Sequence, residues 1–345
     1  MGSSSHSPVV SVSTGWNAEV RRESAPLELP RTEEFVEHPA SWYLFCPSRE
    51  LRSRPVGRRI LDRELVRQAT SSGEVTLMSA RCAHLGADLA RGTLAGDRIR
   101  CPFHGWEYGA DGACLRAPGC SSVPARAQRV YPVVERHGLV FFFNGTQPLF
   151  PLPFFDGERP EDLRAGAPAA FEADCSWFMV TAHAFDLQHF ESVHARRLTG
   201  PLVVDSPCEF ARRSRYSAEV RGQAWYDRLL RTFAGKSVDI SITVFGGTLV
   251  LITGDFARAK SRFLIATQPL GRSRTRCDIV VFGRAPSGTL QRLALPLDLW
   301  VRRLFTRAYL VHETNGLGSP SYSPKSLVEA DRELIDFFRW AATLP

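Results

Sequence analysis

The 345-residue sequence contains no long apolar run. No stretch approaches the roughly 18 to 20 consecutive apolar residues of a transmembrane helix, so we predict no membrane span and no membrane partner. The opening residues, MGSSSHSPVVSVSTG, lack the basic patch and apolar block of a secretory signal. They are small and polar, and we expect a flexible N-terminal segment over residues 1–35.

Cysteine is too sparse for a disulfide framework. The chain has eight cysteines, and two of them stand beside histidines at metal-ligand spacing, so a reducing cytoplasm fits best. The net charge of +7 comes from scattered basic residues, and the densest run, RSRPVGRR at 52–59, has no interleaved aromatic residues. We therefore expect no nucleic-acid partner, and we favour a basic face that meets an acidic protein.

The distribution of apolar runs divides the chain into regions. Residues 36–147 alternate short apolar runs, such as EVTLMSA and LVFFF, with turns, which predicts an all-β domain. The proline-rich stretch 148–170 reads as a connector. Residues 171–345 combine expected helices at 177–198, about 290–313 and 327–342 with strands such as VDISITVF. We predict an α+β fold, with helices packed on one face of an antiparallel sheet.

The first motif pairs two cysteines with two histidines. Cys82-x-His84 is followed, after sixteen intervening residues, by Cys101-x-x-His104. Structural zinc sites usually begin with two cysteines and end with two histidines, whereas here each arm supplies one of each. That set suits a two-iron cluster with both sulfurs on one iron and both imidazoles on the other. A zinc site and four unrelated turn residues are the alternatives.

The motif resembles the Rieske [2Fe–2S] family over roughly residues 40 to 145. The resemblance implies that Cys82 and Cys101 bind one iron, and His84 and His104 the other. Respiratory members carry an extra cysteine in each loop, where this sequence has Ala87 and Phe103. The domain is therefore similar to the soluble oxygenase or ferredoxin type.

A second motif, AFDLQHFESVH, contains Asp186, His189 and His194. Two histidines and a carboxylate can hold one face of Fe(II) and leave sites open for oxygen and substrate. Positions i and i+5 lie about 140° apart around a straight α-helix, so a break or π-bulge must bring the two histidines together. The alternative is a pair of surface or core histidines on an amphipathic helix.

Together the two motifs resemble the Rieske non-heme iron oxygenases. The resemblance implies a helix-grip (START-like) catalytic domain over residues 171–345, with His189 and His194 as ligands of a mononuclear iron. Asp186 then corresponds to the aspartate that bridges electron transfer to the cluster of a neighbouring subunit. The family often has Asn shortly before this Asp, where the sequence has Ala182 and His183, and we expect His183 to be a pocket residue beside the ligands.

A third iron ligand is expected from RAYLVHETNGLGSPSYSPKSLVEAD, which resembles the C-terminal segment of the family. Glu313 is our choice, although Asp is commoner there, with Asp331 and Asp298 as fallbacks. Val301, Phe305, Tyr309 and Glu313 follow one another at i+4 and so predict an inward-facing stripe. An acid at the negative end of a helix dipole is unfavourable unless a cation is bound.

The resemblance implies an enzyme that uses O2 and electrons from NAD(P)H, delivered through a separate reductase or ferredoxin, in a head-to-tail homotrimer. The sequence looks most like the homotrimeric monooxygenase branch that includes aminopyrrolnitrin oxygenase. We expect strands such as VDISITVFGGTLVLITGDF to wall a pocket for a hydrophobic aromatic or polyketide-like metabolite, oxidised at C–H bonds. Arylamine N-oxygenation and demethylation are alternatives within the family. An electron-transfer protein and a ligand-binding protein are alternatives outside it.

Overall fold

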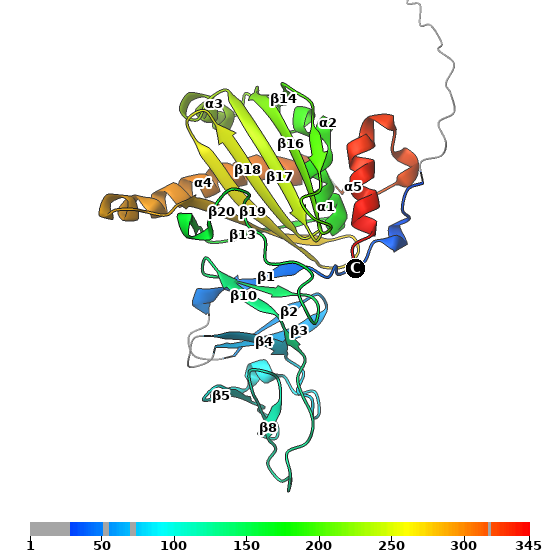
Figure 1. Cartoon of the computed structure of the whole chain (residues 1–345), viewed down its shortest axis with the longest axis vertical. Helices are drawn as coiled ribbons and strands as arrows, with labels where there is room; N and C mark the ends of the chain where they lie inside the picture. Colours follow the sequence, from blue (N-terminus) through cyan, green and yellow to red (C-terminus); the bar gives the residue numbers. More distant parts are fainter. Residues whose placement is uncertain (1–27, 51–54, 70–73, 317–318) are drawn as a thin grey trace, which may run out of the picture.

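The computed structural model describes residues 28–50, 55–69, 74–316 and 319–345, and the side chains of residues 50, 68, 69 and 309–316 lie outside the described part. Figure 1 shows an all-β domain at one end of the molecule and a sheet with helices at the other. This arrangement confirms the predicted α+β fold class. None of the described helices is both long enough and apolar enough to cross a membrane.

The N-terminal domain consists of three small antiparallel sheets. The first joins β1 (Trp42–Pro47), β11 (Leu139–Phe143) and β10 (Val133–Arg136). The second joins β2 (Val56–Ile60), β3 (Arg63–Ala69), β4 (Val75–Ser79) and β9 (Val130–Tyr131). The third joins β5 (Thr93–Ala95), β6 (Arg98–Arg100), β7 (Glu107–Tyr108) and β8 (Cys114–Arg116), and it lies farthest from the second domain (Figure 1).

The second domain is built on one antiparallel sheet. Its order is β12 (Leu163–Ala165), β20 (Thr275–Arg284), β19 (Lys260–Pro269), β18 (Leu249–Phe256), β17 (Ser237–Phe245), β16 (Ala211–Val220) and β14 (Arg196–Leu198). In addition, β13 (Ala169–Ala173) pairs with β20 and β15 (Val203–Asp205) with β16. The end of the expected connector, residues 148–170, is therefore part of this sheet.

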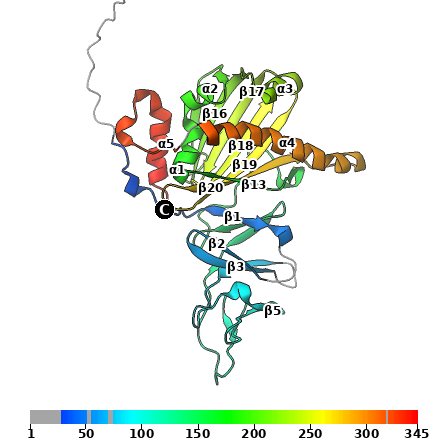
Figure 2. The ribbon, with the colours of Figure 1, turned by 180° about the vertical axis from the view of Figure 1, so that it is seen from behind.

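Five α-helices of the described residues accompany the sheet: α1 (Trp177–Ala182), α2 (Leu187–Ser192), α3 (Trp225–Phe233), α4 (Thr289–Gly316) and α5 (Arg332–Ala342). Figure 2 shows α4 crossing one face of the sheet, while α5 packs beside α1. The expected helix over 177–198 is divided in two, with a 3-10 turn at His183–Phe185 between α1 and α2.

The strand period of two gives the large sheet two different faces. Leu249 and Leu251 of β18 pack with Phe141 and Phe143 of β11 in a core that the two domains share. Val250, from the same strand, belongs to the core on the opposite face, where the helices lie. The five residues of β11 are all buried because its two faces serve different cores. Burial of one such phenylalanine contributes about 1.5–3 kcal/mol.

Part of the segment that we expected to be flexible packs on the second domain. Residues 1–27 lie outside the described residues. Thr32–Glu34 form a 3-10 turn, and the buried Phe35 stacks on Phe178 of α1 with ring centroids 3.9 Å apart. Tyr322 donates a 2.7 Å hydrogen bond to the carbonyl of Pro30. No local pattern in the sequence indicates this contact, because it joins segments far apart in the chain.

Candidate functional site

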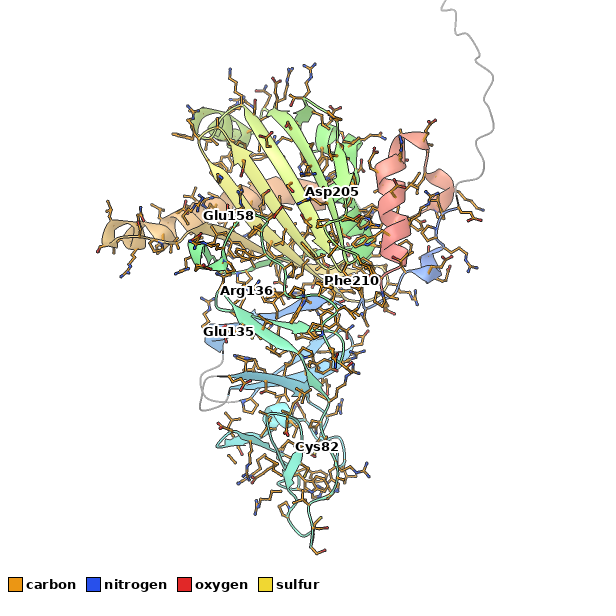
Figure 3. All side chains as sticks on the ribbon, in the orientation of Figure 1. Cys82, Glu135, Arg136, Glu158, Asp205 and Phe210 are labelled. Carbon is orange, nitrogen blue, oxygen red and sulfur yellow. The ribbon has the colours of Figure 1, made fainter. Side chains whose placement is uncertain are left out.

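The two Cys–His motifs form two matching loops at the far end of the N-terminal domain, where Figure 3 labels Cys82. In each loop the cysteine carbonyl accepts the N–H of a glycine four residues later. The distance is 2.8 Å from Gly86 to Cys82 and 3.1 Å from Gly105 to Cys101. Both glycines have positive φ, +74° and +67°, which residues with a side chain rarely adopt. The loops thus turn back sharply and bring the two motifs face to face.

The donors in these loops are arranged by type. The two cysteines are buried, whereas His84 and His104 are exposed at the tip with ring centroids 4.9 Å apart. Burial raises the pKa of the Cys101 thiol, and the neighbouring Cys82 raises this pKa further. Hydrogen bonds from the backbone N–H groups of Phe103 and His104 lower it, but they do not cancel the rise. Two adjacent buried thiols are unfavourable as thiolates unless a cation compensates them. This donor set fits a two-iron cluster with sulfurs inside and imidazoles outside.

Two aromatic residues that sequence reasoning missed support these loops. Tyr108 is fully buried, and its hydroxyl lies 3.1 Å from Cys82 Sγ. Burial raises the pKa of Tyr108, so the hydroxyl stays protonated and can donate to a thiolate. Trp106 stacks on the His84 ring with centroids 4.3 Å apart and planes 7° apart. Both residues stand in CPFHGWEYG, directly after the second loop, and this proximity was the available signal.

A cluster of arginines lies on the sheet that supports the loops. Glu107 of β7 is buried and pairs with Arg98 at 3.4 Å, Arg100 at 2.8 Å and Arg116 at 3.1 Å. Burial alone would raise the pKa of Glu107, but hydrogen bonds from Arg100 and Arg116 outweigh it and lower the pKa. The three guanidinium side chains are each about half exposed. One carboxylate fixes three cations, so this surface, the Glu107 cluster, carries excess positive charge.

The second motif lies at the predicted break in the helix. Asp186 is the N-cap of α2, and its Oδ1 accepts the backbone N–H of His189 at 3.0 Å. Helix α2 ends at Ser192, and the N–H of His194 then reaches the carbonyl of His189 at 3.4 Å, an i to i+5 bond. This wider turn confirms the expected departure from a straight helix. Ala195 follows with a φ of +48°.

The turn brings three imidazoles together. The rings of His189 and His194 are buried, with centroids 4.7 Å apart and planes 88° apart. The ring of His183 stacks on that of His189 at 4.6 Å. Neutral imidazole is a ligand that suits iron, and the close pair of His189 and His194 fits a mononuclear metal site. His183 lies beside them, at the position expected from the sequence.

The three histidines lie on the wall of a cavity of about 250 Å³. Its other walls come from the sheet, α3 and α4, including Ile240, Ile252, Phe263, Leu230 and Phe305. Most of the lining side chains are apolar. Segment 238–256, which was expected to wall a pocket, therefore does so, and strand β19 adds Phe263 to the same wall.

Glu313 lies in helix α4, but its side chain is outside the described residues, so its role as third ligand stays a prediction. The predicted inward stripe is wrong at Val301, which is 37% exposed. Phe305 and Thr306, one turn later, line the cavity. The helix begins at Thr289, at the edge of the domain, and only its later turns face the pocket.

The two fallback carboxylates have partners outside the cavity, although Asp331 also accepts a 3.4 Å hydrogen bond from Gln188, the residue before His189. Asp298 accepts a 2.8 Å hydrogen bond from Nε of Arg302 on α4. Asp331 caps the turn before α5 by accepting the N–H of Val328 at 3.0 Å. Among the residues described, neither lines the cavity that His189 shares. Both carboxylates have local structural partners that account for their positions.

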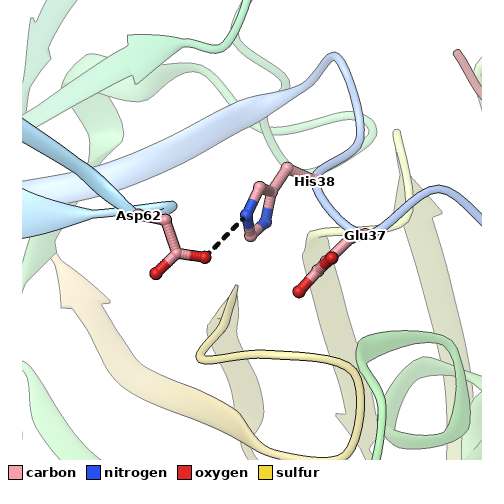
Figure 4. Close-up of side chains that lie close together, drawn as sticks. All are labelled: Glu37, His38 and Asp62. Atoms are coloured by element: carbon pink, nitrogen blue, oxygen red, sulfur yellow. Dashed lines mark hydrogen bonds and ion pairs between the residues drawn. The ribbon is translucent and has the colours of Figure 1, made fainter.

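One further group of ligand-type side chains lies near the junction of the two domains. Figure 4 shows His38 between Glu37 and Asp62, with Nε2 of His38 3.3 Å from Oδ2 of Asp62. Arg59 lies 3.5 Å from Asp62, and Arg272 lies 3.9 Å from Glu37. Because each carboxylate already faces a guanidinium, the group is best explained as surface ion pairing that joins the β2–β3 turn to the segment before β1.

Comparison with known proteins identifies one matching domain family and several similar proteins. Residues 41–132 match the family described as the Rieske [2Fe-2S] domain. The chain is 33% identical over 169 residues to aminopyrrolnitrin oxygenase PrnD of Pseudomonas fluorescens, which covers 45% of this chain and 46% of that protein. It is 35% identical over 159 residues to the tert-butanol monooxygenase / tert-amyl alcohol desaturase oxygenase subunit of Aquincola tertiaricarbonis, covering 44% of this chain and 34% of that protein. The chain thus spans less than half the length of these curated relatives.

Solved structures share the fold over both domains. NdmA of Pseudomonas putida CBB5, solved with caffeine, has a TM-score of 0.66 and 20% identity, over 90% of this chain and 91% of that chain. Dicamba monooxygenase bound to dicamba has a TM-score of 0.60 and 20% identity, over 88% and 96% of the two chains. At these identities the likeness shows the fold alone.

Proposed function

We propose that the chain is a Rieske non-heme iron oxygenase, which uses O2 and externally supplied electrons to oxidise an apolar small molecule. One observation carries the proposal. In a chain that has a Rieske domain, the rings of His189 and His194 meet at 4.7 Å on the wall of an apolar cavity. An electron-transfer protein would need only the cluster, and a ligand-binding protein would need only the cavity. An oxygenase needs both, together with a metal site on the wall of the cavity.

The residues take the following roles in the proposal. Cys82 and Cys101 hold one iron of the cluster, and His84 and His104 hold the other. His189 and His194 hold a mononuclear iron, with Glu313 as the third ligand. When bound, these groups supply electron transfer and the reductive activation of O2. Asp186 fixes the start of α2, and with it the backbone of His189, and is proposed to bridge electron transfer between subunits.

The proposed substrate is a hydrophobic aromatic or polyketide-like molecule, oxidised at a C–H bond. The cavity of about 250 Å³ exceeds the roughly 150 Å³ cavity that accepts benzene. Apolar strands exclude water, and polar side chains such as Thr253 and Ser261 can orient the ligand at the edge of the cavity. Arylamine N-oxygenation and demethylation suit the same cavity, and two relatives of this chain are named aminopyrrolnitrin oxygenase and methylxanthine N1-demethylase.

The proposed electron source is NAD(P)H, through a separate acidic ferredoxin or a reductase. The excess positive charge of the Glu107 cluster supports this choice. A head-to-tail homotrimer is proposed because the cluster loops and the histidine cavity lie at opposite ends of one chain (Figures 1 and 3). A short electron path then has to run between copies. None of the eight cysteines forms a disulfide, which supports a reducing, cytoplasmic setting.

Iron analysis combined with O2 uptake tests the proposal. The wild-type chain is expected to hold three irons, two in the cluster and one at the histidines, and to consume O2 when donor and substrate are supplied. His189→Ala should retain two irons and the Rieske spectrum while losing turnover. Two irons in the wild type would instead favour an electron-transfer protein, and an unchanged His189→Ala would remove the second metal site from the proposal.

A further inference from the structure

A buried ion pair lies directly behind His194. Arg196 is 3% exposed, and its Nη1 donates to the carbonyl of His194 at 2.8 Å and to Oδ1 of Asp227 at 2.8 Å. Asp227 is also 3% exposed and belongs to the first turn of α3. One guanidinium nitrogen therefore connects the backbone of a candidate metal ligand to a different helix.

The backbone around His194 is of a kind that needs such support. Ala195 has a φ of +48°, a conformation that residues with a side chain adopt at a cost. The next residue enters β14, and the carbonyl of Ala195 accepts the N–H of Arg221 at 3.0 Å. The carbonyl of His194, one residue earlier, accepts its hydrogen bond from Arg196. Loss of that bond would free the turn that sets the direction of the His194 side chain.

The carboxylate of Asp227 is also closely packed by its surroundings. A Cβ at Gly222 would lie 2.0 Å from Oδ2 of Asp227, so only glycine leaves room for this carboxylate. Tyr226 and Leu230, on the same helix, line the cavity. Trp225 packs on Phe305 of α4 with ring centroids 5.5 Å apart. The pair thus connects the metal side of the cavity to the helix that forms its opposite wall.

Stability alone does not explain this arrangement. Removing two charges from water costs free energy that their attraction often fails to recover, and apolar residues of similar volume can pack at least as well. What an ion pair adds is direction, because each hydrogen bond fixes one geometry. Groups that orient a metal ligand in this way commonly change metal affinity by about 10- to 100-fold.

We propose that Arg196 and Asp227 are positioning residues for His194, and that they join the metal site to helix α3. The proposal rests on the proposed function, since it requires a metal at His189 and His194. It assigns the pair a role in metal affinity and in the geometry of the ligands. Contact with substrate is not part of that role.

The test uses a double variant, Arg196→Met with Asp227→Leu, which removes both charges and leaves none unpaired. Chains with an intact Rieske cluster are freed of mononuclear iron and titrated with Co²⁺, whose visible spectrum reports ligand geometry. We expect Co²⁺ affinity to fall about 10- to 100-fold and the spectrum to change. The Rieske spectrum should remain. The proposal would be overturned if the double variant bound Co²⁺ with the affinity of the wild type and gave the same Co²⁺ spectrum.

A matched control comes from a second buried pair in the same domain. Arg262 contacts Glu158 at 3.0 Å and the partly exposed Asp255 at 2.6 Å, the side chains of Arg262 and Glu158 are at most 10% exposed, and none of the three residues lines the histidine cavity. Arg262→Met with Glu158→Leu should alter the melting temperature without changing Co²⁺ affinity. An equal loss of affinity in this control would show a general effect of stability and would overturn the proposal.

A conservative variant keeps the test decisive if the double variant folds poorly. Asp227→Asn retains an oxygen that can accept a hydrogen bond from Arg196, whereas Asp227→Leu does not. The Co²⁺ affinity of Asp227→Asn should therefore be close to that of the wild type, and the affinity of Asp227→Leu should be much lower. Equal affinities of these two single variants would contradict the proposal. If the wild type itself binds Co²⁺ no better than His189→Ala does, the proposed function fails, and the positioning role fails with it.

Discussion

Replacement of Tyr108 by phenylalanine should lower the reduction potential of the cluster. The Tyr108 hydroxyl lies 3.1 Å from Cys82 Sγ in a fully buried environment, so no water can replace it as a donor. A hydrogen bond to a charged group is worth about 1.5–3 kcal/mol, against about 1 kcal/mol for a neutral one. The reduced cluster carries more negative charge, and its sulfurs therefore gain more from the donor.

If that difference is about 1 kcal/mol, the midpoint potential falls by about 40 mV, because about 1.4 kcal/mol corresponds to 59 mV for one electron. A redox titration followed by circular dichroism measures this shift. The control is Tyr43→Phe, which removes a buried hydroxyl that donates to the carbonyl of Pro39 at 2.9 Å in the same domain. Both variants should be less stable than the wild type, but only Tyr108→Phe should have a lower midpoint potential of the cluster. A Tyr108→Phe potential equal to that of the wild type would refute the reasoning.

Three further predictions follow from the site. The pKa of Glu107 is lowered from 4.5, so its stabilising contribution is present above that value and is lost as the pH falls through the lowered pKa. Glu107→Gln should therefore unfold more easily in urea by about 1–2 kcal/mol at pH 7, and the difference should shrink below about pH 4. Glu313→Ala should leave two irons and the Rieske spectrum without O2 uptake; three irons would show that another residue is the ligand. Replacing Arg98, Arg100 and Arg116 together by Gln should raise the KM for an acidic ferredoxin about tenfold at low salt, and high salt should reduce the effect because it screens exposed charges. An unchanged KM would mean that the electron donor binds a different surface of the protein.

Local spacing allowed the sequence to predict the first motif and the break in the second. Cys82 and His84 are separated by a single residue in the chain, and the loop geometry that brings them to Cys101 depends on glycines a few residues away. The break before His194 could be predicted because two ligands five residues apart cannot meet on a straight helix. Such features depend on short segments, in which local geometry decides the structure.

Long-range contacts were not predictable in the same way. Asp227 lies 31 residues beyond Arg196, in a different element, and no sequence spacing indicates that the two side chains meet. Phe35 appeared to belong to a flexible segment because its burial depends on Phe178, which is distant in the chain. Val301 was expected to face inward because periodicity shows which residues share a face, but not which face a neighbouring element covers.

The alternation of β7 separates the two surfaces through which electrons are proposed to enter and leave the cluster. Successive side chains of a strand point to opposite faces, so Tyr108 faces Cys82 while Glu107 and its arginines lie on the outer face of the small sheet. The two imidazoles are exposed at a different place, the loop tip, next to the exposed apolar side chains of Leu85 and Phe103. An apolar tip around the imidazoles suits a lasting contact with another copy of the chain, and a charged face suits the brief encounter of a soluble donor. In the proposed trimer, the two surfaces can therefore be occupied at the same time.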